Sequence, residues 1–167
     1  MAAAPHVTAA VLRANPTHVR KLSVGCPQLD SLLGGGIDTH GITELAGEAG
    51  VGKTQLALQL MLVVQLPPII GGIGGCAIFL HSDAASPQPA LNRLASLARA
   101  FAVTHVSSGV TAEGAMNRII VKQIDDAAAL NVCLKRELPE LLGIEREKPV
   151  RLLVLDSIAA LFRTHAD

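Results

Sequence analysis

The fold is decided by one glycine-rich stretch in the first half of the chain, Gly47-Glu48-Ala49-Gly50-Val51-Gly52-Lys53-Thr54. A short run with strand character, residues 41–46, precedes it, and an apolar segment with helical spacing, residues 53–66, follows it. A glycine, four residues and then Gly-Lys-Thr, placed between a strand and a helix, is the pattern of a phosphate-binding loop. Its glycines let backbone N–H groups curve around an anion, and the helix adds its positive end. The stretch therefore predicts a loop that holds the phosphates of a nucleotide.

The polar side chains at the end of this loop have distinct expected roles. Lys53 would bring a positive charge to the β- and γ-phosphates, which also makes it a candidate catalytic residue. The Thr54 hydroxyl would bind Mg²⁺. The expected nucleotide contacts are consecutive in sequence: Gly47, Glu48, Ala49, Gly50, Val51, Gly52, Lys53, Thr54 and Gln55.

A second motif is the apolar run 152–155, which ends at Asp156. In folds with a phosphate-binding loop, a strand that ends in an acid places its carboxylate beside the metal, so Asp156 is expected to hold Mg²⁺ through water. Such runs are common, and this one gains its weight from the loop. Two expected strands separate the two motifs, which leaves room for a further strand inserted between the two strands of the nucleotide site.

A third candidate is Asp83, which follows the apolar run 76–81. Ligands of parallel α/β folds bind at the carboxyl ends of the strands. Asp83 could orient or activate a water for attack on the γ-phosphate, which would make it catalytic. It could equally cap the next helix or lie in a solvated loop, and the sequence favours neither interpretation.

Strands and helices alternate along the chain. The expected strands are 41–46, 76–81, 118–124 and 150–156. The expected helices are a short one within 26–36, then 53–66, 87–101, 127–142 and one that starts at 157. This alternation predicts an α/β fold of the P-loop NTPase type, with a mainly parallel sheet and helices on both faces. Asp126 is expected to cap the helix 127–142, and Pro139 to kink it.

The expected domain organisation is simple. Residues 1–22, rich in Ala with scattered basic side chains, indicate a linker or an N-terminal arm, and residues 23–167 form the core. The core is expected to be incomplete on its C-terminal side, because the chain stops soon after the strand that ends at Asp156. The missing strands would leave apolar surface exposed, which predicts an aggregation-prone chain.

Composition excludes several other classes. The 14 Lys and Arg balance the 14 Asp and Glu, so bulk charge does not indicate a polyanion partner. Aromatic residues make up 2%, and no stacking platform for single-stranded nucleic acid is visible. Cys26, Cys76 and Cys133 lack zinc spacing and indicate reduced thiols in an intracellular protein. Residues 54–82 carry no charge, but Pro67-Pro68 and the glycines that follow favour a helix, a loop and a buried strand over a membrane span.

The residues around these motifs resemble the RecA-like recombinases, and among them a eukaryotic recombinase paralogue. The resemblance covers about residues 22–163. It is carried by Val24-Gly25-Cys26-Pro27, Gly34-Gly35-Gly36-Ile37, Gly41-Ile42-Thr43-Glu44-Leu45-Ala46-Gly47, the run from Gly52 to Leu60, and Leu155-Asp156-Ser157-Ile158.

The resemblance implies a RecA-like ATPase core that binds ATP with Mg²⁺. It implies a nuclear DNA repair protein of homologous recombination, which covers double-strand break repair, crosslink repair and meiotic recombination. The implied partners are another recombinase paralogue in a hetero-oligomer, and single-stranded or branched DNA, contacted through regions absent from this chain. No membrane association is implied.

Two departures from the family pattern bear on catalysis. Asp83 stands where the family usually has Glu, and its shorter side chain reaches less far towards an attacking water. Ala90 stands where the family often has an arginine that packs on the adenine. We therefore expect ATP hydrolysis to be weak or absent.

Two alternatives remain open from the sequence. A small P-loop nucleotide or metabolite kinase would also carry the loop, but it needs several arginines in a lid, and residues 104–125 offer only Arg118 and Lys122. A non-catalytic assembly protein, with ATP as a structural ligand between subunits, would suit the weakened position at Asp83.

Overall fold

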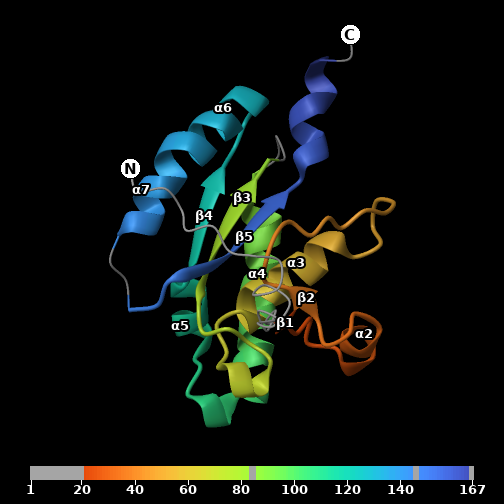
Figure 1. Ribbon diagram of the computed structural model, residues 1–167, viewed down its shortest axis with the longest axis vertical. Coiled ribbons are helices and arrows are strands. Elements are labelled where there is room, and N and C mark those ends of the chain that lie inside the picture. Colours follow the sequence, from red (N-terminus) through yellow and green to blue (C-terminus); the bar gives the residue numbers. More distant parts are fainter. Residues whose placement is uncertain (1–20, 83–85, 145–146, 166–167) are drawn as a thin grey trace, which may run out of the picture.

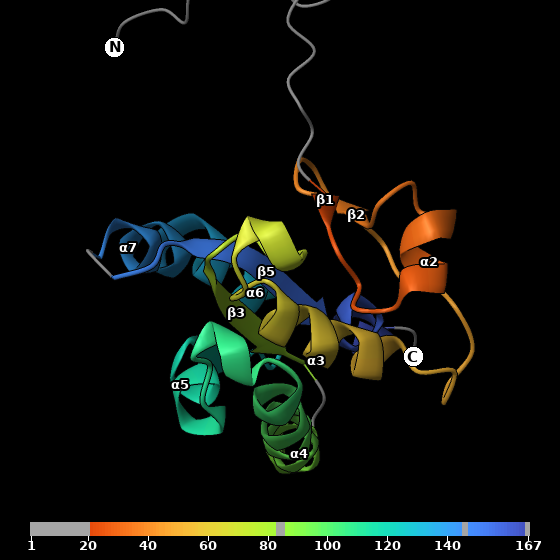
Figure 2. The same cartoon turned by 90° about the horizontal axis from the view of Figure 1, so that it is seen from below.

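The computed structural model describes residues 21–82, 86–144 and 147–165, and it centres on a parallel sheet of three strands (Figure 1). The strands are β3 (Cys76–His81), β4 (Ile119–Gln123) and β5 (Val150–Asp156), in the order β4-β3-β5. Figure 2 shows helices on both sides of this sheet, with α3 (Lys53–Val63) and α4 (Gln88–Thr104) on one face. The predicted α/β fold with a parallel, helix-flanked sheet is confirmed.

The central strand β3 is buried at all of its positions because both of its faces are covered. Its side chains alternate between two cores. Phe79 packs with Leu58 and Leu94 on the face of α3 and α4. Ile78 and Leu80 pack with residues of the opposite helices. This alternation fixes which side chains at the end of the strand can reach α3.

The helices after β4 differ from the single helix expected over 127–142. Three segments follow one another, α6 (Ala127–Val132), the π-helix η3 (Cys133–Glu137) and α7 (Leu138–Gly143). Asp126 caps α6 as predicted, and its Oδ1 accepts a hydrogen bond from the Ala129 N–H at 2.6 Å. The π turn ends two residues before Pro139, whose nitrogen cannot donate a backbone hydrogen bond of a regular helix.

Short elements complete the described chain. A helix within 26–36 is confirmed as α2 (Pro27–Leu32), with proline in its first turn. The connection expected over 104–114 contains the 3₁₀ turn η2 (Val106–Ser108) and the start of α5 (Ala112–Asn117). Two further 3₁₀ segments are η1 (Pro68–Ile70) and η4 (Ile158–His165).

A small antiparallel pair lies apart from the main sheet. Strand β1 (Lys21–Leu22) pairs with β2 (Ile37–Asp38), and Lys21 forms an ion pair with Asp38 at 2.7 Å. The last two residues of the expected linker 1–22 thus belong to a strand. The rest of that segment lies outside the described residues, and the division at residue 23 stays a prediction.

The strand predicted over 41–46 is wrong. These residues form no regular element, and the side chain of Ile42 is 100% exposed. A strand needs a neighbour for its backbone N–H and C=O groups, and none of the described strands pairs with this segment. In the same ranges, β5 has β3 as its neighbour on one edge and no strand on the other. No helix of the described ranges is long and apolar enough to span a bilayer.

Candidate functional site

The glycine-rich loop runs directly into α3. Gly50 and Gly52 have φ angles of +81° and +99°, in the left-handed region that glycine adopts without strain. A Cβ atom on either would meet nothing within 4 Å, so the backbone angle rather than crowding requires glycine here. Gly52 is the N-cap of α3. The loop therefore delivers exposed backbone to the start of a helix of 11 residues.

The start of α3 is a favourable place for an anion. The first turn contains no acidic residue, and Lys53 is the first residue of the helix. The Lys53 ammonium donates hydrogen bonds to the carbonyl oxygens of Gly47, at 2.8 Å, and Glu48, at 2.7 Å. Its positive charge thus lies against the loop, where it adds to the partial charge of the helix N-terminus. A phosphate group fits this combination of charge and exposed backbone.

Thr54 and Asp156 lie in direct contact. The Thr54 hydroxyl donates a hydrogen bond to Asp156 Oδ2 at 2.6 Å, across 102 residues of sequence. The first turn of α3 and the end of β5 thereby bring together the two residues predicted to hold Mg²⁺. Hydroxyl and carboxylate oxygens are ligands that Mg²⁺ prefers, usually with waters and substrate phosphates completing its shell. The described residues contain no group of three or more His, Cys, Asp or Glu that could hold a metal ion.

A pocket of about 420 Å³ opens beside this pair. Gln55 forms part of its wall, and its Oε1 accepts a hydrogen bond from Arg93 Nε at 2.6 Å. Arg93 is exposed, and its bond to Gln55 holds the guanidinium at the wall of the pocket. Ala90 also lines the pocket. The α4 side of the pocket thus carries one guanidinium, one turn beyond the alanine.

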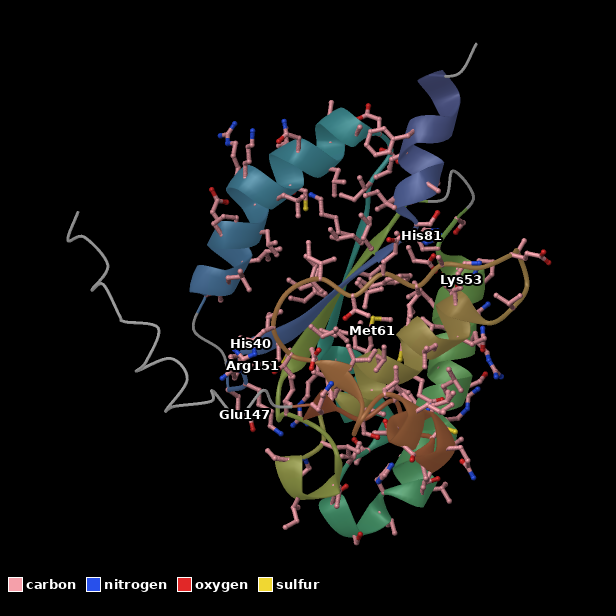
Figure 3. All side chains as sticks on the ribbon, turned by 45° about the vertical axis from the view of Figure 1, so that its right-hand side comes forward. His40, Lys53, Met61, His81, Glu147 and Arg151 are labelled. Carbon is pink, nitrogen blue, oxygen red and sulfur yellow. The ribbon has the colours of Figure 1, made fainter. Side chains whose placement is uncertain are left out.

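His81 is a site residue that sequence reasoning missed. It is 8% exposed, it lines the same pocket, and neither ring nitrogen has a hydrogen-bond partner in the part of the chain that the structure describes. Leaving a buried polar group without a partner costs roughly 1–3 kcal/mol. Its sequence signal is a histidine at the carboxyl end of a strand that is otherwise apolar. Figure 3 shows His81 and Lys53 at the same end of the molecule.

Ser82 holds the end of β5 against β3. Its backbone N–H donates to the Asp156 carbonyl at 3.0 Å, and its hydroxyl accepts a bond from the Ser157 N–H at 2.8 Å. The same hydroxyl donates to the Ser157 carbonyl oxygen. These bonds orient the backbone on both sides of the Asp156 carboxylate. Asp83, the next residue, lies outside the described residues, and its catalytic role stays a prediction.

A parallel α/β sheet with a glycine-rich loop, a lysine and a Thr–Asp pair at one end defines the core of a P-loop NTPase. A family model described as Rad51 matches residues 15–166. The chain belongs to the Rad51 family, which confirms the resemblance to RecA-like recombinases.

Individual relatives agree with the family match. DNA repair protein XRCC3 of Bos taurus is 41% identical over 155 residues, which are 91% of this chain and 44% of that protein. The DNA repair protein XRCC3 homolog of Arabidopsis thaliana is 37% identical, over 94% of this chain and 51% of that protein. The DNA repair and recombination protein RadA of Metallosphaera sedula is 31% identical, over 93% and 44%. The chain spans about half the length of the curated relatives it matches.

Proposed function

We propose that this chain is the nucleotide-binding core of a recombinase paralogue that acts in DNA repair by homologous recombination. The family match and the similarity to XRCC3 proteins support the repair role. The observation that carries the nucleotide site is the contact between Thr54 and Asp156, next to a loop whose lysine lies against it.

The proposed ligand is ATP with Mg²⁺. The backbone of residues 47–52 and the Lys53 ammonium would hold the phosphates, with Gln55 on the adjoining wall of the pocket. Thr54 and Asp156 would hold the metal, Asp156 through water. The metal, when bound, neutralises charge on the β- and γ-phosphates. Hydrolysis is proposed to be weak, because Asp83 has a shorter reach than Glu, and turnover is expected below about 1 s⁻¹, at the low end for enzymes.

The wider role is proposed from the relatives that the chain resembles. The relatives' names place them in DNA repair, which supports a nuclear location for this protein. We propose another recombinase paralogue as its partner in a hetero-oligomer. DNA contacts are proposed to come from regions outside this chain.

Of the two basic residues that a kinase lid could use, Arg118 and Lys122, the second is engaged elsewhere in the structure. Lys122 forms an ion pair with Glu137, and the hydrogen bond between them raises the pKa of Lys122. Glu137 belongs to η3, whose helix covers the face of the sheet opposite to α3. Lys122 therefore cannot serve a lid over the phosphate-binding loop.

The test is a comparison of ATP binding by the parent chain and by Lys53→Ala in the presence of Mg²⁺. Removing a charge-assisted hydrogen bond of about 1.5–3 kcal/mol predicts a loss of affinity of about tenfold or more. Isothermal titration calorimetry measures it. Lys135→Ala is the matched control, because Lys135 is exposed on η3 and is expected to leave the affinity unchanged. Equal affinity of Lys53→Ala and the parent would show that the site is wrongly assigned.

A further inference from the structure

His81 lies beside the proposed metal site and faces α3. In the register of the sheet, His81 is the partner of Asp156 on the neighbouring strand. Side chains of directly paired residues lie on the same face, and Phe79, two residues earlier, packs on the α3 side. The rings of His81 and Phe79 have centroids 5.7 Å apart. The imidazole therefore projects on the face where Thr54 meets Asp156.

The packing of His81 leaves both ring nitrogens without a described hydrogen-bond partner. The ring is more than nine-tenths buried and lines the pocket, and both nitrogens lack partners among the described residues. An apolar side chain would fill this position at the end of a buried strand without leaving a polar group unpaired. The imidazole is thus suited to a group that enters the pocket from outside the chain.

The other polar groups of the pocket indicate what that group is. Asp156 is the only acidic side chain in the described lining, and it already contacts Thr54. The remaining polar side chains, among them Gln55 and Arg93, offer N–H or O–H donors. A lining rich in donors, with one carboxylate to steady a metal, suits an anion that arrives with a divalent cation.

We propose that His81 is a binding residue for the terminal phosphate of the nucleotide, to which a ring N–H donates a hydrogen bond. This inference rests on the proposed function. Thr54 and Asp156 would hold the metal that accompanies the phosphates, and His81 is paired with Asp156 and lines the same pocket, so the group expected nearest His81 is the end of the phosphate chain rather than the sugar or base. His81 then distinguishes a triphosphate from a diphosphate.

The test uses two nucleotide probes, the non-hydrolysable triphosphate AMP-PNP and the diphosphate ADP, each in the presence of Mg²⁺. Isothermal titration calorimetry measures the affinity for each. His81→Phe keeps a ring of similar size and removes both nitrogens. It is expected to lower AMP-PNP affinity about tenfold or more and to leave ADP affinity within about twofold, because one hydrogen bond to a charged group is lost. His81→Asn places an amide N–H near the Nδ1 position, and His81→Gln places one near the Nε2 position. One of these two variants is expected to restore part of the preference for AMP-PNP over ADP. His105→Phe is the matched control, since His105 lies at the C-terminal end of α4 beside Phe101.

The outcomes separate this inference from the proposed function. If His81→Phe keeps the preference of the parent, or weakens both ligands equally, His81 only supports the shape of the pocket and the inference is overturned. If the parent binds neither probe, the proposed function fails and the inference fails with it. Should His81→Phe not fold, ¹⁵N NMR of the parent's histidine rings decides the matter. The His81 signals are expected to shift with AMP-PNP and much less with ADP, and equal shifts would overturn the inference.

Discussion

At Thr54, a single hydroxyl links the helix after the loop to the end of β5. Through its bond to Asp156, the Thr54 side chain in the first turn of α3 orients a carboxylate 102 positions away in the sequence. The hydroxyl serves two purposes in the proposed site, because it orients the carboxylate and supplies an oxygen to the metal.

Thr54→Ala is therefore expected to remove most of the gain in ATP affinity that Mg²⁺ gives the parent. Affinity with and without the metal, measured by titration in Mg²⁺ and in EDTA, reports this gain. Thr54→Ser keeps the hydroxyl and is expected to keep the gain. Thr104→Ala is a control at the far end of α4, where the hydroxyl only bonds to the Ala100 carbonyl. A Thr54→Ala chain that responds to Mg²⁺ as the parent does would contradict the assignment of the metal site.

Residues of the site differ in how readily the sequence predicts them. The loop and Thr54 are contiguous, so a local pattern finds them. Asp156 is found because an acid ends an apolar strand. His81 was missed because its importance comes from pairing with Asp156 across two strands, and this register is set by packing of distant segments. The bond between Gln55 and Arg93 has the same origin, since α3 and α4 meet only in the folded chain.

Among the elements, α6 depends on a cap that a substitution can remove. The Asp126 carboxylate accepts the Ala129 N–H, which otherwise has no partner within the first turn of the helix. Asp126→Ala is expected to lower the free energy of unfolding by about 1 kcal/mol, the usual cost of losing an N-cap. Urea unfolding followed by circular dichroism measures it. Asp125→Ala, which loses only an exposed bond from Gln123, is expected to change it by less than about 0.5 kcal/mol. Similar losses in both variants would refute the capping role.

The elements also show where sequence patterns stop being informative. The runs 76–81 and 150–156 became strands because each contains at least four consecutive apolar residues and lies between helices in the chain. The run 41–46 was also expected to be a strand, but it is irregular, because a strand depends on a neighbour that local sequence does not reveal. The division of the helix 127–142 was only partly visible. Pro139 indicated a disturbance, whereas no local sequence pattern indicated the π turn over 133–137.

At the scale of the whole molecule, several large apolar side chains face solvent. Ile42, Ile69 and Leu32 are 100%, 93% and 82% exposed. One edge of β5 also lacks a neighbouring strand in the described ranges. Exposed apolar surface and an open strand edge both favour contacts between copies of a chain.

The chain of 167 residues is therefore expected to self-associate as its concentration rises. Size-exclusion chromatography with light scattering measures the mass in solution. Replacing Ile42 and Leu32 by lysine is expected to reduce the association, whereas Lys135→Ala provides a surface control. A chain that stays monomeric at all concentrations and melts sharply and reversibly would contradict this expectation.

Within the described residues, β5 pairs with a strand on one edge only, and this bears on how firmly the site is held. Amides at the margin of a sheet exchange their protons through small local openings, and Asp156 sits at the end of such a strand. A ligand that binds α3 and β5 at the same time would suppress these local openings. By reciprocity, whatever suppresses the openings must tighten the grip on the ligand by the same free energy. Ligand binding at the loop and hydrogen-exchange protection of the β5 amides therefore report the same equilibrium.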